Sequence, residues 1–423
     1  MRAEAFVRRL EEAGGRAYYV GGFVRDRLMS CCPHDADLCI CGLASAAMRT
    51  LFPAAVAISR SFPVFSMRIE GLNEGAPVEV ALARLERKTS SGYRGFAAHT
   101  GPEITIEEDL LRRDITINSM ALRLGRNGEP SGPVIDPCGG QADIARRIIR
   151  ATSSFFSDDP VRALRAARFA ARLGFEVEEA TVGLMASMKA ELSQEPAERF
   201  VKELEAAMSC ERPSVFFAEL RRAGLLEVAY PELLSPAASK GDASGDFARF
   251  MRVLDNTALL SPRSEVRFAS LFQSFDDEAD GGLSSLSRLR QFKTLLPISG
   301  LYYSCAALVA EETARLTASP TPEKNAALLG RLAKSALDVD GFYALCRASG
   351  KNMAALPGNP LLCLEAMKAA RRELALTLRA SGAGTDFSGE ELRAAYADAE
   401  ANAVARVQKE EAAFIKGPQE ENR

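Results

Sequence analysis

Asp35 and Asp37 are two carboxylates separated by a single residue, at the start of a run that is rich in β-forming residues. Side chains alternate along a strand, so a strand over this segment would place both carboxylates on the same face. Paired carboxylates provide the hard oxygen ligands that Mg²⁺ prefers, and bound Mg²⁺ usually completes its shell with substrate phosphates and water. Two aspartates on a strand edge are also common without any function, so the pair predicts a metal site only together with a neighbouring phosphate site.

A glycine pair upstream of the aspartates is a candidate for that phosphate site. Gly21 and Gly22 separate an apolar, strand-like run at residues 17–20 from a helix-like segment at residues 23–29. A helix N-terminus offers free backbone N–H groups and the positive end of a dipole, and Arg25 adds a fixed charge. The segment therefore predicts a phosphate-binding turn that is followed, after a short linker, by the two aspartates.

Four arginines share one face of a predicted helix further along the chain. Asp158, Asp159 and Pro160 are typical of a helix start. At about 100° per residue, roughly one third of the helix circumference carries the arginines that follow, Arg162, Arg165, Arg168 and Arg172. The opposite side carries small and apolar residues, Leu164, Ala167 and Ala171. Neighbouring like charges repel, so the arginine face indicates either an anionic ligand or a solvated surface with Asp and Glu partners.

These segments together resemble the bacterial-type (class II) tRNA nucleotidyltransferase and poly(A) polymerase family, which belongs to the polymerase-β-like nucleotidyltransferase superfamily. The family pattern is Gly-Gly-x-Val-Arg-Asp-x-Leu, a gap, and Asp-x-Asp, and this sequence carries it at residues 21–28 and 35–37. The resemblance is strong from about residue 17 to about residue 235 and fades beyond.

Three further motifs carry the same resemblance. Residues 112–120 match the family's Arg-Arg-Asp-x-Thr-x-Asn-Ala-Met motif, with Ser119 in place of Ala. Residues 136–140 match Asp-Pro-x-Gly-Gly. Residues 158–162 match Glu-Asp-x-x-Arg, with Asp158 in place of Glu, which keeps the charge and shortens the arm.

The resemblance implies an α+β fold that is mostly α overall. A small nucleotidyltransferase (polymerase-β-like) mixed-sheet head would be followed by an all-helical neck, body and tail. We expect the catalytic head at residues 1–140 and the neck, which would recognise the base and phosphates of the nucleotide, at residues 141–210. The helical body would span residues 211–330, and the helical tail, which would bind tRNA, residues 331–423.

The resemblance also implies a function, the template-independent addition of CMP and AMP from CTP and ATP to the 3′ end of tRNA. This reaction builds or repairs the CCA terminus and releases pyrophosphate. Asp35 and Asp37 would be the catalytic residues and the ligands of Mg²⁺. The expected partners are therefore the 3′ end and acceptor arm of tRNA together with ATP and CTP, and no protein partner is implied.

The nucleotide-binding residues that the resemblance implies are Gly22, Arg25, Arg113, Asp159, Arg162, Arg165 and Arg168. The first three would hold the triphosphate, and Asp159 with Arg162 would hydrogen-bond the base in place of a nucleic-acid template. Arg165 and Arg168 would lie near the nucleotide and its phosphates. Asp114 and Asn118 would help to recognise the ribose.

Two segments of the head allow more than one interpretation. Strands are predicted at residues 64–69 and 78–82, and Glu79 in the second is either a third acidic residue of the metal site or an ordinary exposed strand residue. Residues 86–102 are rich in Gly, Ser and charge, which predicts a mobile loop. In the family, the corresponding loop is associated with addition of the terminal A.

Composition narrows the class of protein. The chain has 423 residues and a net charge of -3, so a nucleic-acid ligand would depend on the local field along one groove. No apolar run reaches membrane-spanning length, and nine cysteines without framework spacing indicate a reducing cytoplasm. Only two histidines are present, so the His-Asp phosphohydrolase domain that enterobacterial-type CCA-adding enzymes often carry is not expected.

Two alternative functions stay open at this point. The chain could be an A-adding tRNA nucleotidyltransferase or a poly(A) polymerase, because the catalytic motifs within the family are nearly identical. It could also be a catalytically inactive RNA-binding protein built on the same head. The intact set of Asp35, Asp37, Arg113, Asp159 and Arg162 argues against an inactive protein.

Overall fold

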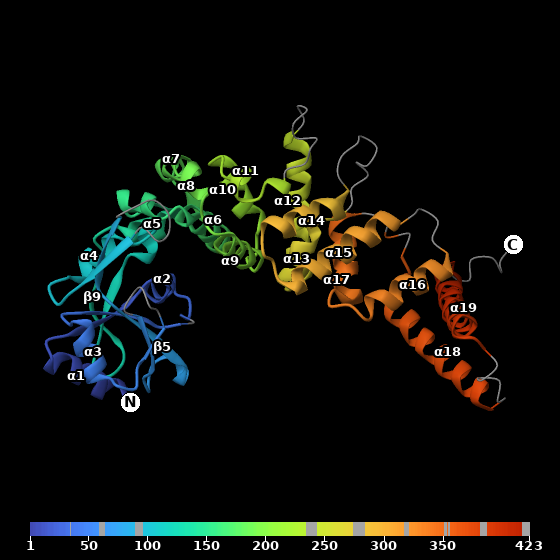
Figure 1. The fold of residues 1–423 in the computed structure, drawn as a ribbon, viewed down its shortest axis with the longest axis horizontal. Coiled ribbons are helices and arrows are strands. Elements are labelled where there is room, and N and C mark those ends of the chain that lie inside the picture. Colours follow the sequence, from blue (N-terminus) through green and yellow to red (C-terminus); the bar gives the residue numbers. More distant parts are fainter. Residues whose placement is uncertain are drawn as a thin grey trace. The chain divides into compact units, whose positions relative to one another are not determined.

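The computed structural model describes residues 1–33, 35–58, 64–88, 96–233, 243–273, 284–316, 321–350, 353, 356–380 and 387–416. The chain divides into two compact units (Figure 1). The first unit comprises Met1–Glu203 and Val215–Pro231, and the second comprises Leu204–Ser214 and Glu232–Arg423. The expected boundary at residue 140 lies inside the first unit, and the division into head, neck, body and tail stays a prediction.

A seven-stranded mixed sheet forms the N-terminal part of the first unit, with the strand order β3-β4-β5-β2-β1-β8-β9. Its strands are β1 (Arg16–Val20), β2 (Asp37–Cys41), β3 (Val56–Ala57), β4 (Val64–Arg68), β5 (Pro77–Leu82), β8 (Ala121–Leu124) and β9 (Pro130–Ile135). The central strand β2 pairs antiparallel with β1 and parallel with β5. The strands that the sequence predicts at residues 17–20, 64–69 and 78–82 are confirmed.

Helices pack on both faces of this sheet. On one face lie α1 (Ala3–Glu12) and α3 (Ser45–Leu51), and the rings of Phe6 and Phe52 at their contact have centroids 4.9 Å apart (Figure 1). On the other face lies α4 (Ile106–Leu111), whose buried residues pack with Tyr18 and Val20 of β1. Because successive side chains of a strand point to opposite faces, β1 contributes to both cores.

The structure differs from two predictions within this region. The strand β2 begins at Asp37, so Asp35 lies just before the strand and not within it as predicted, although Ala36 is buried between two exposed aspartates, as the alternation predicts. Pairing with β1 does not extend to Asp35, because the antiparallel strand β1 ends at Val20, which lies opposite Asp37. The predicted loop at residues 86–102 overlaps a hairpin of β6 (Arg84–Lys88) and β7 (Phe96–Thr100), whose main-chain pairing is indifferent to the polar composition. Residues 89–95 of that segment lie outside the described residues.

The rest of the first unit is mostly helical. Its helices are α2 (Gly22–Leu28), α5 (Gly140–Arg146), α6 (Val161–Leu173), α7 (Glu179–Ser187), α8 (Lys189–Leu192), most of α9 (Ala197–Met208), nearly all of α10 (Ser214–Arg222), and α11 (Leu226–Ala229). The last residues of α9 and the first residue of α10 belong to the second unit. Two short parallel strands, β10 (Ile148–Ile149) and β11 (Glu176–Val177), flank α6 in the chain. The side chain of Asp159 accepts a hydrogen bond of 3.1 Å from the backbone N–H of Val161, so the acidic start that the sequence predicts for α6 is confirmed.

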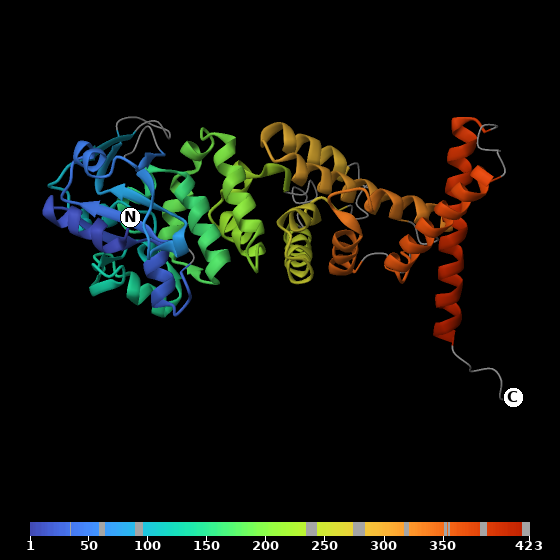
Figure 2. The ribbon, with the colours of Figure 1, turned by 90° about the horizontal axis from the view of Figure 1, so that it is seen from below.

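The described part of the second unit is helical. Its helices are α12 (Ala243–Leu260), α13 (Ser264–Ser270), α14 (Ser285–Leu295), α15 (Gly300–Arg315), α16 (Pro322–Leu332), α17 (Asp338–Ser349), α18 (Pro360–Ala380) and α19 (Gly389–Lys416). Figure 2 shows α18 and α19 packed together, and Arg371 of α18 forms an ion pair of 2.9 Å with Glu400 of α19. No helix within the described ranges is long and apolar enough to cross a membrane. The predicted fold class, a mixed-sheet head followed by a mostly helical chain, is confirmed.

Candidate active site

One cavity of about 800 Å³ in the first unit brings the predicted site residues together. It is lined by all nine of them, Gly22, Arg25, Asp35, Asp37, Arg113, Asp159, Arg162, Arg165 and Arg168. Glu79, Asp114 and Asn118 line it as well. These residues come from α2, from β2 and the residues just before it, from β5, from the segment after α4, and from α6 and the residues just before it. The fold therefore collects in one place motifs that are far apart in the sequence.

The cavity lining includes three carboxylates, Asp35, Asp37 and Glu79, which we call the acidic floor. Asp37 is the first residue of β2, and the parallel register with β5 places Glu79 directly beside it. Within the described residues, these three side chains make no hydrogen bond or ion pair. The neighbourhood of Glu79 and Asp37 follows from the strand register and favours the interpretation that Glu79 takes part in the site.

Electrostatic crowding at the acidic floor perturbs Asp37. Burial and the carboxylate of Glu79 raise its pKa to about 6, Asp35 adds to the rise, and Arg113 opposes it. Among the described residues, no group of three or more His, Cys, Asp or Glu could hold a metal ion alone. A cation at the floor would therefore take part of its ligands from phosphate and water, as Mg²⁺ usually does.

The glycine turn lies next to two guanidinium groups. Gly21 adopts a φ of 68°, a conformation that glycine tolerates best. A β-carbon at Gly22 would lie 3.4 Å from Nη2 of Arg25, and one at Gly21 would lie 3.7 Å from Nη1 of Arg113. The absence of side chains at this turn thus leaves room for the two arginines, as well as for a ligand that approaches the backbone.

Arg25 is bound on two sides by other residues of the cavity. Its side chain is 2% exposed, Nε donates to Oδ1 of Asp26 at 2.8 Å, and Nη2 pairs with the same oxygen at 2.6 Å. Its Nη1 donates to Oδ1 of Asn118 at 2.7 Å. Arg25, which the sequence places at the triphosphate, is therefore fully engaged within the protein.

Arg113 is held by Asp109, a buried residue of α4 that the sequence analysis missed. Nε and Nη2 of Arg113 donate to Oδ2 of Asp109 at 3.2 and 2.9 Å. Burial alone would raise the pKa of Asp109, but Arg113 and Arg112 outweigh it and lower the pKa to about 2. Asp109 stands four residues before Arg113, and this helical spacing of opposite charges was the signal that could have found it.

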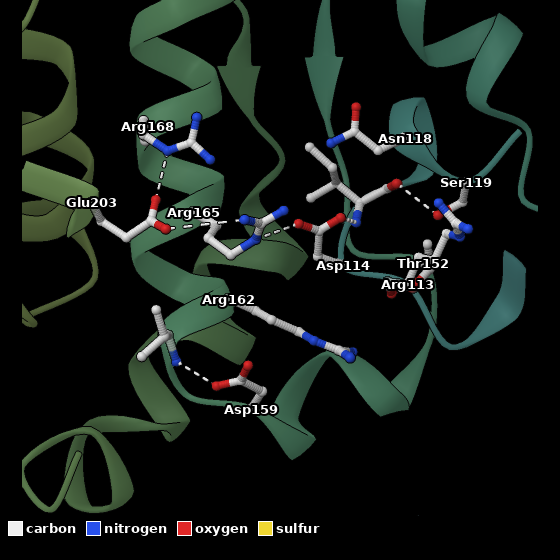
Figure 3. A network of polar contacts seen from close by, with 12 residues as sticks. Arg113, Asp114, Asn118, Ser119, Thr152, Asp159, Arg162, Arg165, Arg168 and Glu203 are labelled. Carbon is white, nitrogen blue, oxygen red and sulfur yellow. Dashed lines mark hydrogen bonds and ion pairs between the residues drawn. The ribbon is translucent and has the colours of Figure 1, made fainter. Parts of the chain in front are cut away.

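The helix α6 contributes Arg162, Arg165 and Arg168 to the cavity lining, and we call these three the arginine wall (Figure 3). Arg172, the fourth arginine of the predicted helix face, lines the cavity as well. Leu164, Ala167 and Ala171, on the other side of the helix, are buried, as the periodicity predicts. The arginine wall lines a cavity, which fits the interpretation that these residues bind an anionic ligand. It also has acidic partners, which the alternative interpretation of a surface with Asp and Glu partners predicted.

Every arginine of the wall is held by another group. Nε of Arg165 donates to Oδ2 of Asp114 at 2.8 Å, and Nε of Arg168 donates to Oε2 of Glu203 at 2.5 Å (Figure 3). Nη1 of Arg162 donates to the backbone carbonyl of Phe155 at 2.7 Å. Burial would raise the pKa of Asp114, but Arg165 and Arg162 outweigh it and lower the pKa. The wall is therefore an arrangement of fixed guanidinium groups rather than a free positive surface.

Asp159, at the start of α6, is fixed from two directions. Its Oδ1 caps the helix at Val161, and its Oδ2 accepts a hydrogen bond of 2.7 Å from Nη2 of Arg199. Arg199 is itself bound to the buried Glu195 at 2.6 Å. The sequence analysis assigned no site role to Arg199 or Glu203.

Models of two domain families match the chain. Residues 17–150 match the "Poly A polymerase head domain", and residues 174–235 match the "Probable RNA and SrmB- binding site of polymerase A". Together the matches cover the segments that form the cavity, apart from residues 151–173, which include Asp159 and the whole of α6.

One relative and two solved structures are also similar to this chain. The chain is 45% identical over 221 residues to the "Multifunctional CCA protein" of Vibrio cholerae serotype O1 (strain M66-2), and the match covers 51% of each chain. The chain thus spans about half the length of the curated relative it matches. A CCA-adding enzyme in complex with ATP has a similar fold, with a TM-score of 0.67, 21% identity, and coverage of 99% of this chain and 94% of that chain.

A second structure, the Thermotoga maritima CCA-adding enzyme complexed with tRNA, has a TM-score of 0.58 and 22% identity. The similarity covers 84% of this chain and 80% of that one. At these identities the solved structures establish the fold alone, whereas the motifs and the matched domains establish the relationship. Residues 17–150 and 174–235 therefore match domains of poly(A) polymerases, and the chain is similar to CCA-adding enzymes.

Proposed function

We propose that this chain is a CCA tRNA nucleotidyltransferase, which adds CMP and AMP from CTP and ATP to the 3′ end of tRNA without a nucleic-acid template. The observation that carries the proposal is a single cavity lined by both the acidic floor and the arginine wall. Such a site suits a nucleoside triphosphate with a bound cation. The printed names of the relatives, a multifunctional CCA protein and CCA-adding enzymes solved with ATP and with tRNA, support this choice.

The acidic floor fits a divalent cation, for which we propose Mg²⁺ bound by Asp35 and Asp37. Three adjacent carboxylates without ion pairs among the described residues, one of them with a raised pKa, are an arrangement that a cation would stabilise. When bound, Mg²⁺ would activate the 3′-hydroxyl of tRNA and neutralise charge on the departing pyrophosphate. Glu79 lies beside Asp37 and would support the orientation of these ligands.

The triphosphate would lie along the glycine turn and the guanidinium groups that face it. Gly22 allows close approach of the backbone, and Arg113 presents its guanidinium group in the orientation that Asp109 imposes. Arg25 lies behind the turn and adds positive charge to it. Arg165 and Arg168 would face the remaining phosphate oxygens, while Asp114 and Asn118 would bind the ribose.

Asp159 and Arg162 would select the base. An ionised carboxylate can only accept hydrogen bonds and a guanidinium group can only donate them. Cytosine offers an amino group beside acceptors, and adenine offers an amino group beside N1, so one acceptor arm and one donor arm satisfy either base. Uracil and guanine present a carbonyl where Asp159 needs a donor. The hold of Arg199 on Asp159 supports this role, because a fixed acceptor discriminates better than a mobile one.

The helices of the second unit would bind the tRNA, by shape and by contacts to its backbone. A cytoplasmic location for this reaction stays a prediction from the cysteine usage. An A-adding enzyme or a poly(A) polymerase would use the same cavity, so the head alone does not separate these activities. An inactive RNA-binding protein would not need three adjacent carboxylates in one cavity with three fixed arginines.

The proposal is tested with purified protein, Mg²⁺ and three tRNA substrates that end before CCA, before CA and before A. Each is incubated with each labelled nucleotide. A CCA-adding enzyme incorporates two C residues and one A residue and then stops. Addition of A to the third substrate alone identifies an A-adding enzyme, and continued addition of A identifies a poly(A) polymerase. No incorporation on any substrate would overturn the proposal.

A further inference from the structure

The side chain of Arg25 is almost completely buried and is held by other residues of the chain. Arg25 is 2% exposed, and Asp26 takes both its Nε and its Nη2. The guanidinium carbon lies 5.4 Å from the ring centroid of Phe169 on α6. Because the side chain is almost completely buried and three of its five N–H groups are already bound, a phosphate could reach this guanidinium group only if neighbouring side chains moved.

The remaining arm of Arg25 determines how the amide of Asn118 is oriented. A guanidinium group has no acceptor, so the atom of Asn118 that faces Nη1 at 2.7 Å must be the amide oxygen. The amide nitrogen is consequently the atom left for another partner. Asn118 is 7% exposed and lines the cavity, and its Nδ2 makes no hydrogen bond within the described residues. This donor is therefore available to a ligand in the cavity that accepts a hydrogen bond.

We propose that Arg25 is a positioning residue for sugar recognition. It holds Asn118 so that Nδ2 donates to a hydroxyl oxygen of the bound nucleotide's ribose. The inference rests on the proposed function, because it takes the ligand to be a nucleoside triphosphate. Asp26 fixes the other side of Arg25, so the chain of contacts runs from Asp26 through Arg25 to Asn118. Arg25 acts on the sugar without touching it.

A direct phosphate contact and a positioning role predict different results. If Arg25 bound the triphosphate, Arg25→Lys would weaken binding of every nucleotide by the same factor, as we expect for Arg113→Lys. If Arg25 orients Asn118, the variant loses the hydrogen bond to the sugar. Binding of CTP then weakens, while binding of the analogue that lacks the relevant hydroxyl hardly changes. A purely structural role would lower the affinity for all nucleotides together.

The experiment compares the dissociation constants of CTP, 2′-deoxy-CTP and 3′-deoxy-CTP for the full chain in Mg²⁺. The variants are Arg25→Lys and Asp26→Asn, and Arg27→Lys, an exposed residue of the same helix, is the matched control. We expect wild type to prefer CTP over at least one analogue by about fivefold or more, the value of one hydrogen bond. Arg25→Lys should reduce this preference toward one, Asp26→Asn should reduce it less, and the control should keep it.

The inference is overturned if wild type shows no preference among the three nucleotides, or if Arg25→Lys weakens all three equally. Thermal unfolding checks that each variant is folded, and if Arg25→Lys is not, Asp26→Asn carries the test. Nucleotide binding needs no tRNA and no turnover, so this result is separate from the transfer assay. A wild-type protein that binds CTP with the expected preference but transfers no CMP to tRNA would contradict the proposed function and leave the role of Arg25 intact.

Discussion

The acidic floor and the arginine wall of the cavity carry their charges in opposite ways. Asp35, Asp37 and Glu79 of the acidic floor have no ion-pair partner within the described residues, and their mutual repulsion contributes to the raised pKa of Asp37. The arginine wall is already satisfied, because each guanidinium group binds a carboxylate or a backbone carbonyl. The floor therefore favours an added cation, whereas the wall is prepared to hold a ligand in one orientation.

Energetics explain why the floor and the wall differ. Three arginines on one helix face would repel each other without Asp114 and Glu203, which also fix the guanidinium groups in place. A preorganised wall loses little conformational freedom when a ligand binds, so it can discriminate between ligands of similar charge. An unneutralised floor discriminates poorly but binds a cation strongly. Substitutions on the floor should therefore affect rate, and substitutions on the wall should affect selectivity.

The largest effect is expected from Asp37→Asn, which removes charge from the floor and keeps its shape. We expect the single-turnover rate of CMP incorporation in Mg²⁺ to fall by about 100-fold or more, equivalent to roughly 2.7 kcal/mol. Binding of CTP should be partly retained, since the arginines are unchanged. Glu12→Gln, at the exposed end of α1, is the control. A rate within about tenfold of wild type would discard the assignment of Asp37 to the metal.

Selectivity should change most when the wall loses its acceptor. Asp159→Ala or Arg162→Ala should lower the rate with CTP and ATP and raise the relative use of UTP and GTP. The unpaired group that a wrong base leaves costs about 1–3 kcal/mol, or roughly 5- to 150-fold in selectivity. The measurement is the ratio of catalytic efficiencies for the four nucleotides on one tRNA primer. If both variants keep the wild-type ratio, Asp159 is only a helix cap.

A variant of Arg199 makes the test of base selection more specific, because Arg199 contacts Asp159 and would not contact the base itself. Arg199→Ala should shift the same ratio in the same direction but less than Asp159→Ala. In the double variant, the loss of selectivity should equal that of Asp159→Ala alone, since a positioning residue has no effect without the group it positions. Additive losses would show that Arg199 acts independently.

The β6–β7 hairpin starts at Arg84, which lines the cavity. Shortening the hairpin therefore tests whether the choice of base depends on the arginine wall alone. Lys88 and Phe96 are paired, and residues 89–95 can be replaced by Asn-Gly, which suits a two-residue connection. We expect addition of the two cytidines to be spared and addition of the final adenosine to fall by about tenfold or more. Equal losses in both steps would show that the loop acts generally and not as a switch.

The smallest effect concerns the stability of the metal-free floor. Because the pKa of Asp37 is raised from 3.8 to about 6, its stabilising contribution is complete below pH 3.8 and is lost as the pH rises through about 6. Asp37→Asn cannot ionise, so in EDTA at pH 8 it should unfold at a higher temperature than wild type. The difference should vanish near pH 4, and Mg²⁺ should reverse it. An unchanged difference across this range would place the repulsion elsewhere.

The local motifs of the chain are enough to predict its chemistry and fold class. Gly-Gly with Arg25, the Asp35 and Asp37 pair and the arginines of α6 depend only on short spacings, which strand and helix periods convert into shared faces. Every residue predicted on this basis lines the cavity. The same reasoning failed where a partner strand set the limit, since Asp35 lies outside β2 because β1 ends at Val20.

Contacts between distant segments were decided by the tertiary structure alone. The parallel register of β2 and β5 brings Glu79 beside Asp37, and helix packing brings Glu203 to Arg168 and Arg199 to Asp159. No spacing within a motif encodes these pairs, because a one-residue change of register would move a side chain to the other face of the sheet. The sequence by itself was enough to predict which groups would do the chemistry. The packing of strands and helices decided which charges stay free for a cation and which are held in place, because burial requires partners for some and leaves others facing the cavity.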